Sequence, residues 1–339
     1  SIYYDINIFD SHKNLDPSRN YASQITRGGS SSIKKSLSPW WISGFVDAEG
    51  SFGVSASMKE TSMKTSMQFK ITQKSMNKSV LEGIVDYFGV GKVHTDNSFT
   101  ATLKFQIQDI PSIREKVIPH FDKYPLMSSK YMDYTDWKNA VQIIYDKEHL
   151  NQEGQNKILE IKDRINNSRN EFERWKFLHD KCNTENFSLN PAWVQGFIDG
   201  EGTFQFDIGE TRNRGKMYFR TNPTLEIAQS NHDVVLLEII KEFIDSGYIK
   251  PKFNTSNFYE TINSRPVSRY VTTQEQAVIK FIDEYPLQTT KQLDYIDWKR
   301  LVEIKIEGAY KTPEGRTIIE IIKKNINRGR IYLLLTEYL

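Results

Sequence analysis

Apolar residues at helical spacing mark two short, matching segments of the chain. One begins after Ser38 and the other after Asn190, and both continue to a glutamate followed by a glycine: WISGFVDAEG and WVQGFIDGEG. Both caps precede a proline, which is typical of a helix start because proline needs no hydrogen-bond acceptor there. We therefore predict one helix ending near Glu49 and a second ending near Glu201.

Beyond each glycine the apolar spacing changes from helical to alternating, which is typical of a β-strand with one buried face. The inward positions are predicted to be Phe52, Val54 and Ala56 in the first copy and Phe204, Phe206 and Ile208 in the second. The residues between them are mostly polar or small, so the opposite face is expected to be exposed. Each helix is thus predicted to run directly into a strand.

The two segments open a longer internal repeat. Three further blocks recur in the same order: FKITQKSMNKSVLEGIVDYFGVGKV with LEIAQSNHDVVLLEIIKEFIDSGYI, HFDKYPLMSSKYMDYTDWK with FIDEYPLQTTKQLDYIDWK, and HLNQEGQNKILEIKDRINNSRN with YKTPEGRTIIEIIKKNINRGR. Each half is predicted to contain a helix, a strand pair, a helix, a strand pair and final helices. This αββαββα order indicates an α+β fold with two pseudo-symmetric repeats and antiparallel sheets.

The repeat sets the expected domain boundaries. We predict a flexible, Gly-, Ser- and Lys-rich N-terminal arm at residues 1–37, a first repeat at 38–170, a linker at 171–189 and a second repeat at 190–339. Two stretches lengthen the second repeat, GETRNRGKMYFRTN and FNTSNFYETINSRP, and we interpret them as longer hairpin tips. Pro223, inside a predicted strand, indicates an edge or a bulge.

Small residues lie four apart in both motif helices: Gly44 and Ala48 in the first, Gly196 and Gly200 in the second. Such a stripe allows the backbone of another helix to approach closely. We therefore expect the two helices to pack on each other about an approximate two-fold axis, with Glu49 and Glu201 as near neighbours.

Two carboxylates held together at helix C-termini would repel each other and the helix dipoles. A divalent cation relieves that repulsion, and hard oxygen ligands favour Mg²⁺. The chemistry that follows is metal-assisted hydrolysis of a phosphate ester. The alternative is a solvated pair of glutamates, which the matched duplication disfavours. A calcium-loop interpretation lacks the required oxygen ligands.

The composition restricts the possible functions but does not identify one. The 339 residues carry a net charge of +2, which does not by itself indicate nucleic-acid binding, because binding depends on where the charges lie. The single cysteine, Cys182, excludes an internal disulfide, and no histidine pair has metal-ligand spacing on a helix. We expect no transmembrane helix and no secretory signal. The abundance of Lys, Asn, Ile and Tyr fits an AT-rich organellar genome.

The motifs SGFVDAEG and QGFIDGEG, with the strands and the YPL…K…DY…WK blocks behind them, resemble the LAGLIDADG homing endonucleases of the single-chain, two-repeat type. The resemblance extends over roughly residues 39–330. It implies that Glu49 and Glu201 bind metal, with the adjoining Ala48 and Gly200 in the metal site. Asp47 and Asp199 are expected to support the helix ends instead.

The resemblance also implies polar and basic residues around the metal. Gln73 and Gln229, at the ends of the second strands, and Lys130 and Lys291, after YPL, match the family's positions. Their expected roles are ordering solvent and countering phosphate charge, the alternative being ordinary surface groups. Asn77 stands where the family often has a basic residue, a departure that bears on the auxiliary set.

The family's fold implies two antiparallel sheets that form a saddle over double-stranded DNA. Outward polar and basic side chains are of the kind that read base edges and phosphates. The predicted DNA contacts are Ser51, Ser55, Ser57, Lys59, Lys64, Gln68, Lys70, Thr72, Lys74, Thr102, Lys104 and Gln106 in the first half, and Gln205, Asp207, Arg212, Arg214, Lys216, Arg220, Thr224, Glu226 and Arg269 in the second.

The two halves differ in most outward residues, so a monomer is expected to read a long asymmetric target. The family cuts both strands across the minor groove and leaves short 3′ overhangs. We expect Mg²⁺ to support cleavage and Ca²⁺ to support binding alone. The resemblance and the composition together predict a fungal, mitochondrial, intron-encoded protein.

Two rival functions remain open at this point. An intron RNA maturase would use the same fold to bind RNA and assist splicing, and RNA binding without DNA cleavage would favour it. A paired-carboxylate glycosidase would need an aromatic-lined sugar cleft, and it explains the duplication poorly.

Overall fold

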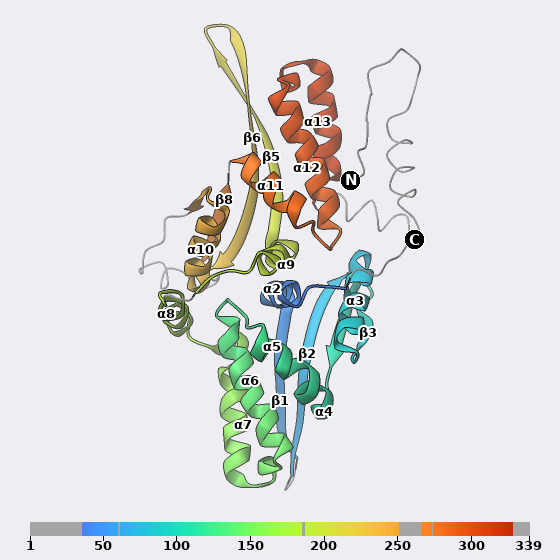
Figure 1. Ribbon diagram of the computed structural model, residues 1–339, viewed down its shortest axis with the longest axis vertical. Coiled ribbons are helices and arrows are strands. Elements are labelled where there is room, and N and C mark those ends of the chain that lie inside the picture. The colour runs from blue at the N-terminus through green and yellow to red at the C-terminus, as the bar shows by residue number, and fades with distance from the viewer. Residues whose placement is uncertain (1–35, 60–61, 185–186, 251–265, 273, 328–339) are drawn as a thin grey trace. The chain divides into compact units, whose positions relative to one another are not determined.

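A computed structural model describes residues 36–59, 62–184, 187–250, 266–272 and 274–327 (Figure 1). Residues 1–35 of the predicted arm and most of the FNTSNFYETINSRP insertion therefore lie outside the described residues. Within the described part, the helix–strand order of the first half recurs in the second.

The first half contains α2 (Pro39–Glu49), β1 (Gly50–Lys59), β2 (Ser62–Lys74), α3 (Lys78–Phe88), β3 (Lys92–Asn97), β4 (Thr102–Ile107), α4 (Ile110–Ser112), α5 (Ile118–Lys123), α6 (Lys130–Tyr145) and α7 (Gln152–Arg164). The second half contains α9 (Pro191–Glu201), β5 (Gly202–Asn213), β6 (Lys216–Ser230), α10 (Val234–Ile244), β7 (Tyr248–Lys250), β8 (Val267–Thr272), α11 (Glu275–Glu284), α12 (Lys291–Ile306) and α13 (Pro313–Asn325). Helix α8 (Glu171–Cys182) joins them, within the stretch predicted as a linker.

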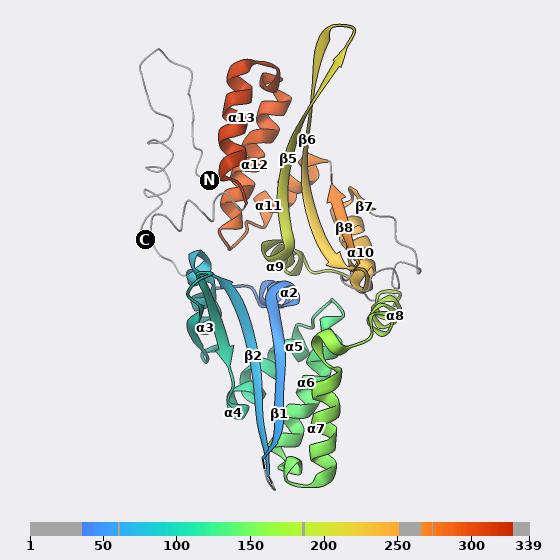
Figure 2. The same cartoon turned by 180° about the vertical axis from the view of Figure 1, so that it is seen from behind.

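Each half forms one four-stranded antiparallel sheet, in the orders β1-β2-β4-β3 and β5-β6-β8-β7 (Figures 1 and 2). This confirms the α+β class and the two-repeat architecture. The prediction undercounted the helices, since α5 and α11 lie between the last strand and the YPL block of each half. Their short apolar runs, such as VIPHF, carry too few turns for a clear helical period.

The predicted strand faces are correct where alternation was strongest. Phe52 pairs with Phe69 and Phe204 with Leu225, and all four are fully buried. Pro223 pairs only with β5, because the β6–β8 ladder begins at Leu225. It therefore occupies the edge position that its missing amide requires.

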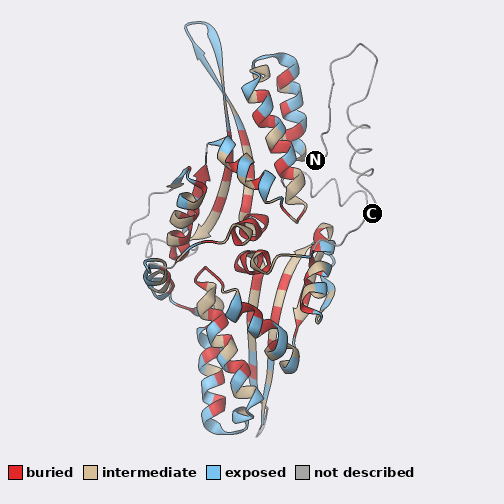
Figure 3. Cartoon of the chain, viewed as in Figure 1, coloured by how far each residue is buried: buried red, intermediate tan, exposed pale blue. Residues whose placement is uncertain are grey.

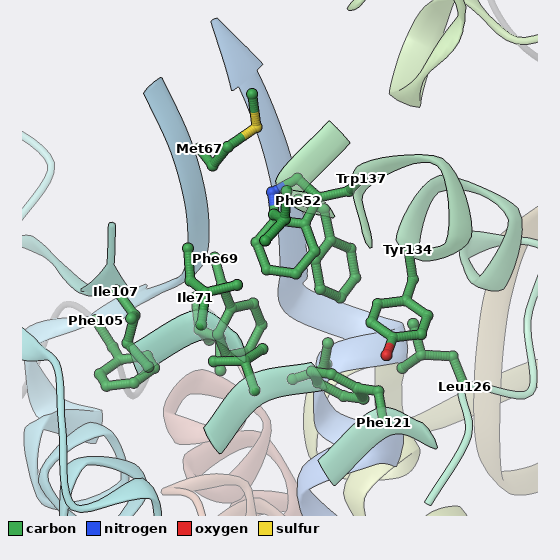
Figure 4. Close-up of a cluster of buried hydrophobic side chains, with 14 of the residues drawn as sticks. Phe52, Met67, Phe69, Ile71, Phe105, Ile107, Phe121, Leu126, Tyr134 and Trp137 are labelled. Carbon is green, nitrogen blue, oxygen red and sulfur yellow. The ribbon is translucent and has the colours of Figure 1, made fainter. Parts of the chain in front are cut away.

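Aromatic side chains fill the core between the first sheet and its helices. The ring of Phe52 lies 5.1–5.6 Å from the rings of Phe69, Phe121, Tyr134 and Trp137 (Figure 4). Burial of these large apolar surfaces is the main stabilising contribution in this half. The two motif helices are buried along most of their length (Figure 3).

The motif helices α2 and α9 pack against each other with almost no space between their backbones. A β-carbon on Gly44 would lie 2.0 Å from the Trp193 carbonyl oxygen, and one on Gly196 would lie 2.1 Å from that of Trp41. Glycine is therefore required at both crossings, as the small-residue stripe predicts. The reciprocal contacts make the C-terminal ends of the two helices neighbours.

Helix α8 is anchored by buried charge. Arg174 donates to Asp133 on α6 at 2.8 Å, and both side chains are almost fully buried. Arg169, just before α8, also pairs with Asp133 at 3.3 Å. No helix in the described residues is long and apolar enough to span a membrane.

Candidate active site

Glu49 and Glu201 end the paired helices and lie close together. A β-carbon on Gly200 would lie 3.2 Å from Cγ of Glu49 and 2.2 Å from Cβ of Ala48. Both glutamates are half-buried, and burial raises the pKa of both carboxyls. The charge of Glu49 raises the pKa of Glu201 further. The two acids are therefore electrostatic neighbours, as the sequence predicts.

Asp47 and Asp199 hold the helix pair together through reciprocal hydrogen bonds. Trp193 Nε1 donates to Asp47 at 2.8 Å, and Trp41 Nε1 donates to Asp199 at 2.7 Å. Each aspartate also accepts backbone amides of its own half, from Met127 at 2.7 Å and from Gln288 at 2.9 Å. Donors of the protein itself therefore occupy the carboxylate oxygens of Asp47 and Asp199, which confirms that these residues support the helix ends.

Lys130 and Lys291 lie beneath the acids, at the C-terminal ends of the helices. Lys130 Nζ donates to the carbonyls of Val46 at 2.9 Å and Gly50 at 2.7 Å. Lys291 Nζ donates to those of Ile198 at 3.1 Å and Gly200 at 2.8 Å. Val46 and Ile198 also accept the amides of Gly50 and Gly202, so each ammonium adds a second donor at its helix end and counters the negative end of the helix dipole.

Burial lowers the pKa of both lysines, and the neighbouring carboxylates oppose that shift. The largest opposing contribution comes from Asp47 at Lys130 and from Asp199 at Lys291, and both glutamates contribute at each lysine. The lysines are therefore part of the centre and not ordinary surface groups. The bonds to helix-end carbonyls were not predicted, and the roles expected toward solvent and phosphate stay predictions.

Gln73 and Gln229 hydrogen-bond to the two acids, Gln73 to Glu49 and Gln229 to Glu201, and each bond lowers the pKa of its carboxyl. Their neighbours differ. Asn77 Nδ2 donates to Gln73 Oε1 at 2.9 Å, whereas the equivalent residue of the second half is Asp233. The acids and their glutamines are thus equivalent in the two halves, whereas the next residues outward, Asn77 and Asp233, differ.

The donors suit a hard divalent cation better than a softer metal. Among the described residues no group of three or more His, Cys, Asp or Glu could hold an ion. A bound ion would therefore be shared between two carboxylates and oxygen atoms supplied from outside the protein, as Mg²⁺ allows. Ala48 and Gly200, expected in the metal site, lie against each other, and the Gly200 carbonyl already accepts from Lys291.

The predicted DNA-facing residues of the first sheet lie on its outward side and partly bind one another. Gln106 donates to Gln68 at 2.5 Å, and Lys104 pairs with Asp96 at 3.1 Å. The half-buried members are Ser51, Gln68, Lys70, Thr72, Lys74, Thr102, Lys104 and Gln106, and the exposed ones are Ser55, Ser57 and Lys64. The side chain of Lys59 lies outside the described residues.

The predicted long hairpin of the second half is present. Arg214 and Gly215 both have positive φ, 48° and 76°, at the turn between β5 and β6. This two-residue turn keeps the hairpin twisted. Its basic residues are all exposed: Arg212, Arg214, Lys216 and Arg220.

Four residues of the second sheet that were predicted to face DNA differ in their surroundings. Asp207 and Arg269 are exposed, as expected. Thr224 is only 5% exposed, so the prediction that it is available to DNA is wrong. It shares the outward face of its partner Gln205, so the alternation is right, but neighbouring structure covers the position. Glu226 pairs with Lys250 at 2.9 Å.

Several contacts of the site were not predicted from the sequence. The indoles of Trp41 and Trp193 carry the reciprocal bonds, and their matched position in both repeats was the available signal. Asn77 and Asp233 accept backbone amides of the opposite half, from Thr290 and Ser129, each at 3.0 Å. Only the three-dimensional pairing of the halves brings these atoms together.

Comparisons with known proteins agree with this geometry. "Probable intron-encoded endonuclease 3" of Neurospora crassa is 26% identical over 296 residues, covering 84% of this chain and 54% of that protein. "Probable intron-encoded endonuclease Cox1-I1b" of Schizosaccharomyces pombe is 27% identical over 304 residues, covering 88% and 73%. The chain thus spans about half the length of the first of these relatives.

Solved structures match over most of their length. I-SmaMI bound to cleaved DNA superposes with a TM-score of 0.72 at 27% identity, covering 87% of this chain and 98% of that one. I-LtrWI bound to target DNA gives 0.71 at 30% identity, covering 86% and 98%. The sequence profile described as LAGLIDADG endonuclease matches residues 42–141 and 194–302, more than half of the chain. The chain belongs to the LAGLIDADG endonuclease family and carries both repeats in one polypeptide.

Proposed function

We propose that the protein is a site-specific endonuclease that makes a staggered double-strand break in a long, asymmetric DNA target, using a divalent metal. The observation that carries the proposal is the adjacent placement of Glu49 and Glu201 at the ends of α2 and α9. Two acids related by the helix pair supply one carboxylate for each DNA strand. The solved structure of I-SmaMI with uncleaved DNA in the presence of calcium ions supports a divalent-metal requirement.

Mg²⁺ is the metal that this centre would take, with Glu49 and Glu201 as its protein ligands. When bound, it supplies Lewis acidity and lowers the pKa of coordinated water. Lys130 and Lys291 offset the negative charge of the acids and keep the helix ends rigid. Gln73 and Gln229 orient the carboxylates through hydrogen bonds, so that the acids need not reorganise during the reaction.

The two sheets supply the DNA-contacting surface. Their outward faces carry amides, hydroxyls and cations, which suit base edges and phosphates. Because the outward residues of the two halves differ, the target has unlike half-sites. A single chain holds both acids, so the protein cuts as a monomer. The names of the fungal relatives support an origin in a mitochondrial intron.

The direct test is cleavage of a randomised double-stranded DNA library in Mg²⁺, followed by sequencing of the cut ends. The expected result is one asymmetric consensus with short 3′ overhangs, and intact binding without cleavage when Ca²⁺ replaces Mg²⁺. Binding to intron RNA with no cleavage of any library member would overturn the proposal in favour of a maturase.

A further inference from the structure

A chain of hydrogen bonds runs from the second half of the protein to the first acid. The backbone amide of Thr290 donates to Asn77 Oδ1 at 3.0 Å, and Asn77 Nδ2 donates to Gln73 Oε1 at 2.9 Å. Gln73 in turn lies beside Glu49 and, as a hydrogen-bond donor, lowers the pKa of that carboxyl. Asn77 is only 8% exposed, so water does not compete freely for these bonds.

The direction of this chain follows from chemistry alone. A backbone amide can only donate and an ionised carboxylate can only accept, so both ends are determined. Asn77 must therefore present its oxygen to Thr290 and its amino group to Gln73. Gln73 must then present its own amino group to Glu49. The amide orientation of Gln73 is thereby selected by Asn77.

The equivalent chain in the second half is broken. Asp233 occupies the position of Asn77 and accepts the amide of Ser129 at 3.0 Å. Its other oxygen lies 3.5 Å from His232 Nε2, and His232 contacts Glu171 on helix α8. A carboxylate has no hydrogen to donate to Gln229. Asp233 therefore cannot select the orientation of Gln229 in the way that Asn77 selects the orientation of Gln73.

We infer that Asn77 is a positioning residue that orients Gln73 toward Glu49, and that Asp233 leaves the Glu201 centre less ordered. The two centres are therefore unequal, and the two DNA strands are cut at different rates. This inference rests on the proposed function. It assigns the difference to a single pair of equivalent positions, one an amide and the other an acid.

The first test is Asn77→Asp, which keeps the oxygen that accepts from Thr290 and removes the donor to Gln73. Cleavage of each end-labelled strand is measured under single-turnover conditions, at saturating Mg²⁺, on the consensus target. The faster strand is expected to slow about tenfold, with little change in the other. Asn190→Asp is the matched control, because Asn190 caps α9 by accepting the amide of Ala192 and lies at the far end of the helix. It should leave the strand ratio unchanged.

The second test is Asp233→Asn, which buries no new charge and adds a donor beside Gln229. It is expected to speed cleavage of the slower strand and bring the two rates together.

A third measurement needs no cleavage. The signal of the Gln73 side-chain amide is recorded in a nitrogen-15 NMR spectrum and is assigned by its loss in Gln73→Leu. The chemical shift of this amide is expected to change in Asn77→Asp and to remain unchanged in Asn190→Asp.

The outcomes separate this inference from the proposed function. Absence of cleavage by the unchanged protein on every DNA tested would overturn both. Normal cleavage with equal strand rates, or an equal loss on both strands in Asn77→Asp, would overturn the inference and leave the endonuclease assignment standing.

Discussion

The two halves match closely at the ends of their motif helices but differ in the lengths of their first two strands. At the ends of α2 and α9, equivalent residues make equivalent bonds: Trp193 Nε1 donates to Asp47, and Trp41 Nε1 donates to Asp199. The strands diverge, since β5 and β6 have 12 and 15 residues where β1 and β2 have 10 and 13. The difference fits the proposed function, in which one geometry serves both acids while each sheet contacts a different half-site.

The largest effect is expected from substituting the acids, which are equivalent in the two halves. Glu49→Gln or Glu201→Gln removes one carboxylate with little change in shape. Double-strand cleavage should fall by about a thousandfold or more, because several kcal/mol of charge stabilisation are lost. Gel-shift binding to the target in Ca²⁺ should persist. Full cleavage by either variant would refute the roles of these acids.

The close approach of α2 and α9 gives the next largest effect. Gly196→Ala places a β-carbon 2.1 Å from the Trp41 carbonyl oxygen, and backbone must move to accept it. The free energy of unfolding, measured by urea denaturation, should fall by about 3 kcal/mol. Gly209→Ala is the matched control in the divergent hairpin, where the nearest atom would be 4.0 Å away. Equal stability of both variants would contradict the packing argument.

A smaller effect is expected in the divergent strands. Replacing Arg212 and Arg214 by alanine removes two exposed charges from the β5–β6 hairpin. DNA affinity should fall, and the slope of log affinity against log salt should decrease by about one for each lost phosphate contact. Arg300→Ala, which removes an exposed arginine of α12, is the control and should leave the slope unchanged. An unaltered slope in the hairpin variant would exclude that hairpin from the DNA interface.

The smallest effect concerns stability of the metal-free protein against pH. Burial raises the pKa of Glu49 in the folded state, so the folded protein binds a proton more readily than the unfolded chain. The protonated form is therefore stabilising below the ordinary pKa of glutamate, and this contribution is lost as pH rises through the folded pKa. Glu49→Gln should raise Tm by about 2 °C at pH 7, with the gain disappearing near pH 4. A gain of the same size at pH 4 and pH 7 would contradict this argument.

Prediction from sequence was most reliable where a local pattern had one physical interpretation. Proline after a cap residue located the starts of both motif helices, and alternation located the buried faces of β1 and β5. The helices α5 and α11 were missed because their apolar runs are short. Thr224 was misjudged because strand alternation assigns a face but says nothing about what lies above it.

The sequence by itself determined the duplication, the paired acids and the small-residue stripe, because each is written in local spacing that repeats. Only the tertiary structure decided which atoms of one half serve the other: the crossed bonds of Trp41 and Trp193, and the amides received by Asn77 and Asp233. Those partners are separated by more than a hundred residues in every case, and no local period connects them. Their contacts exist because two glycine-lined helices meet at backbone distance, which sets the position of everything around the acids.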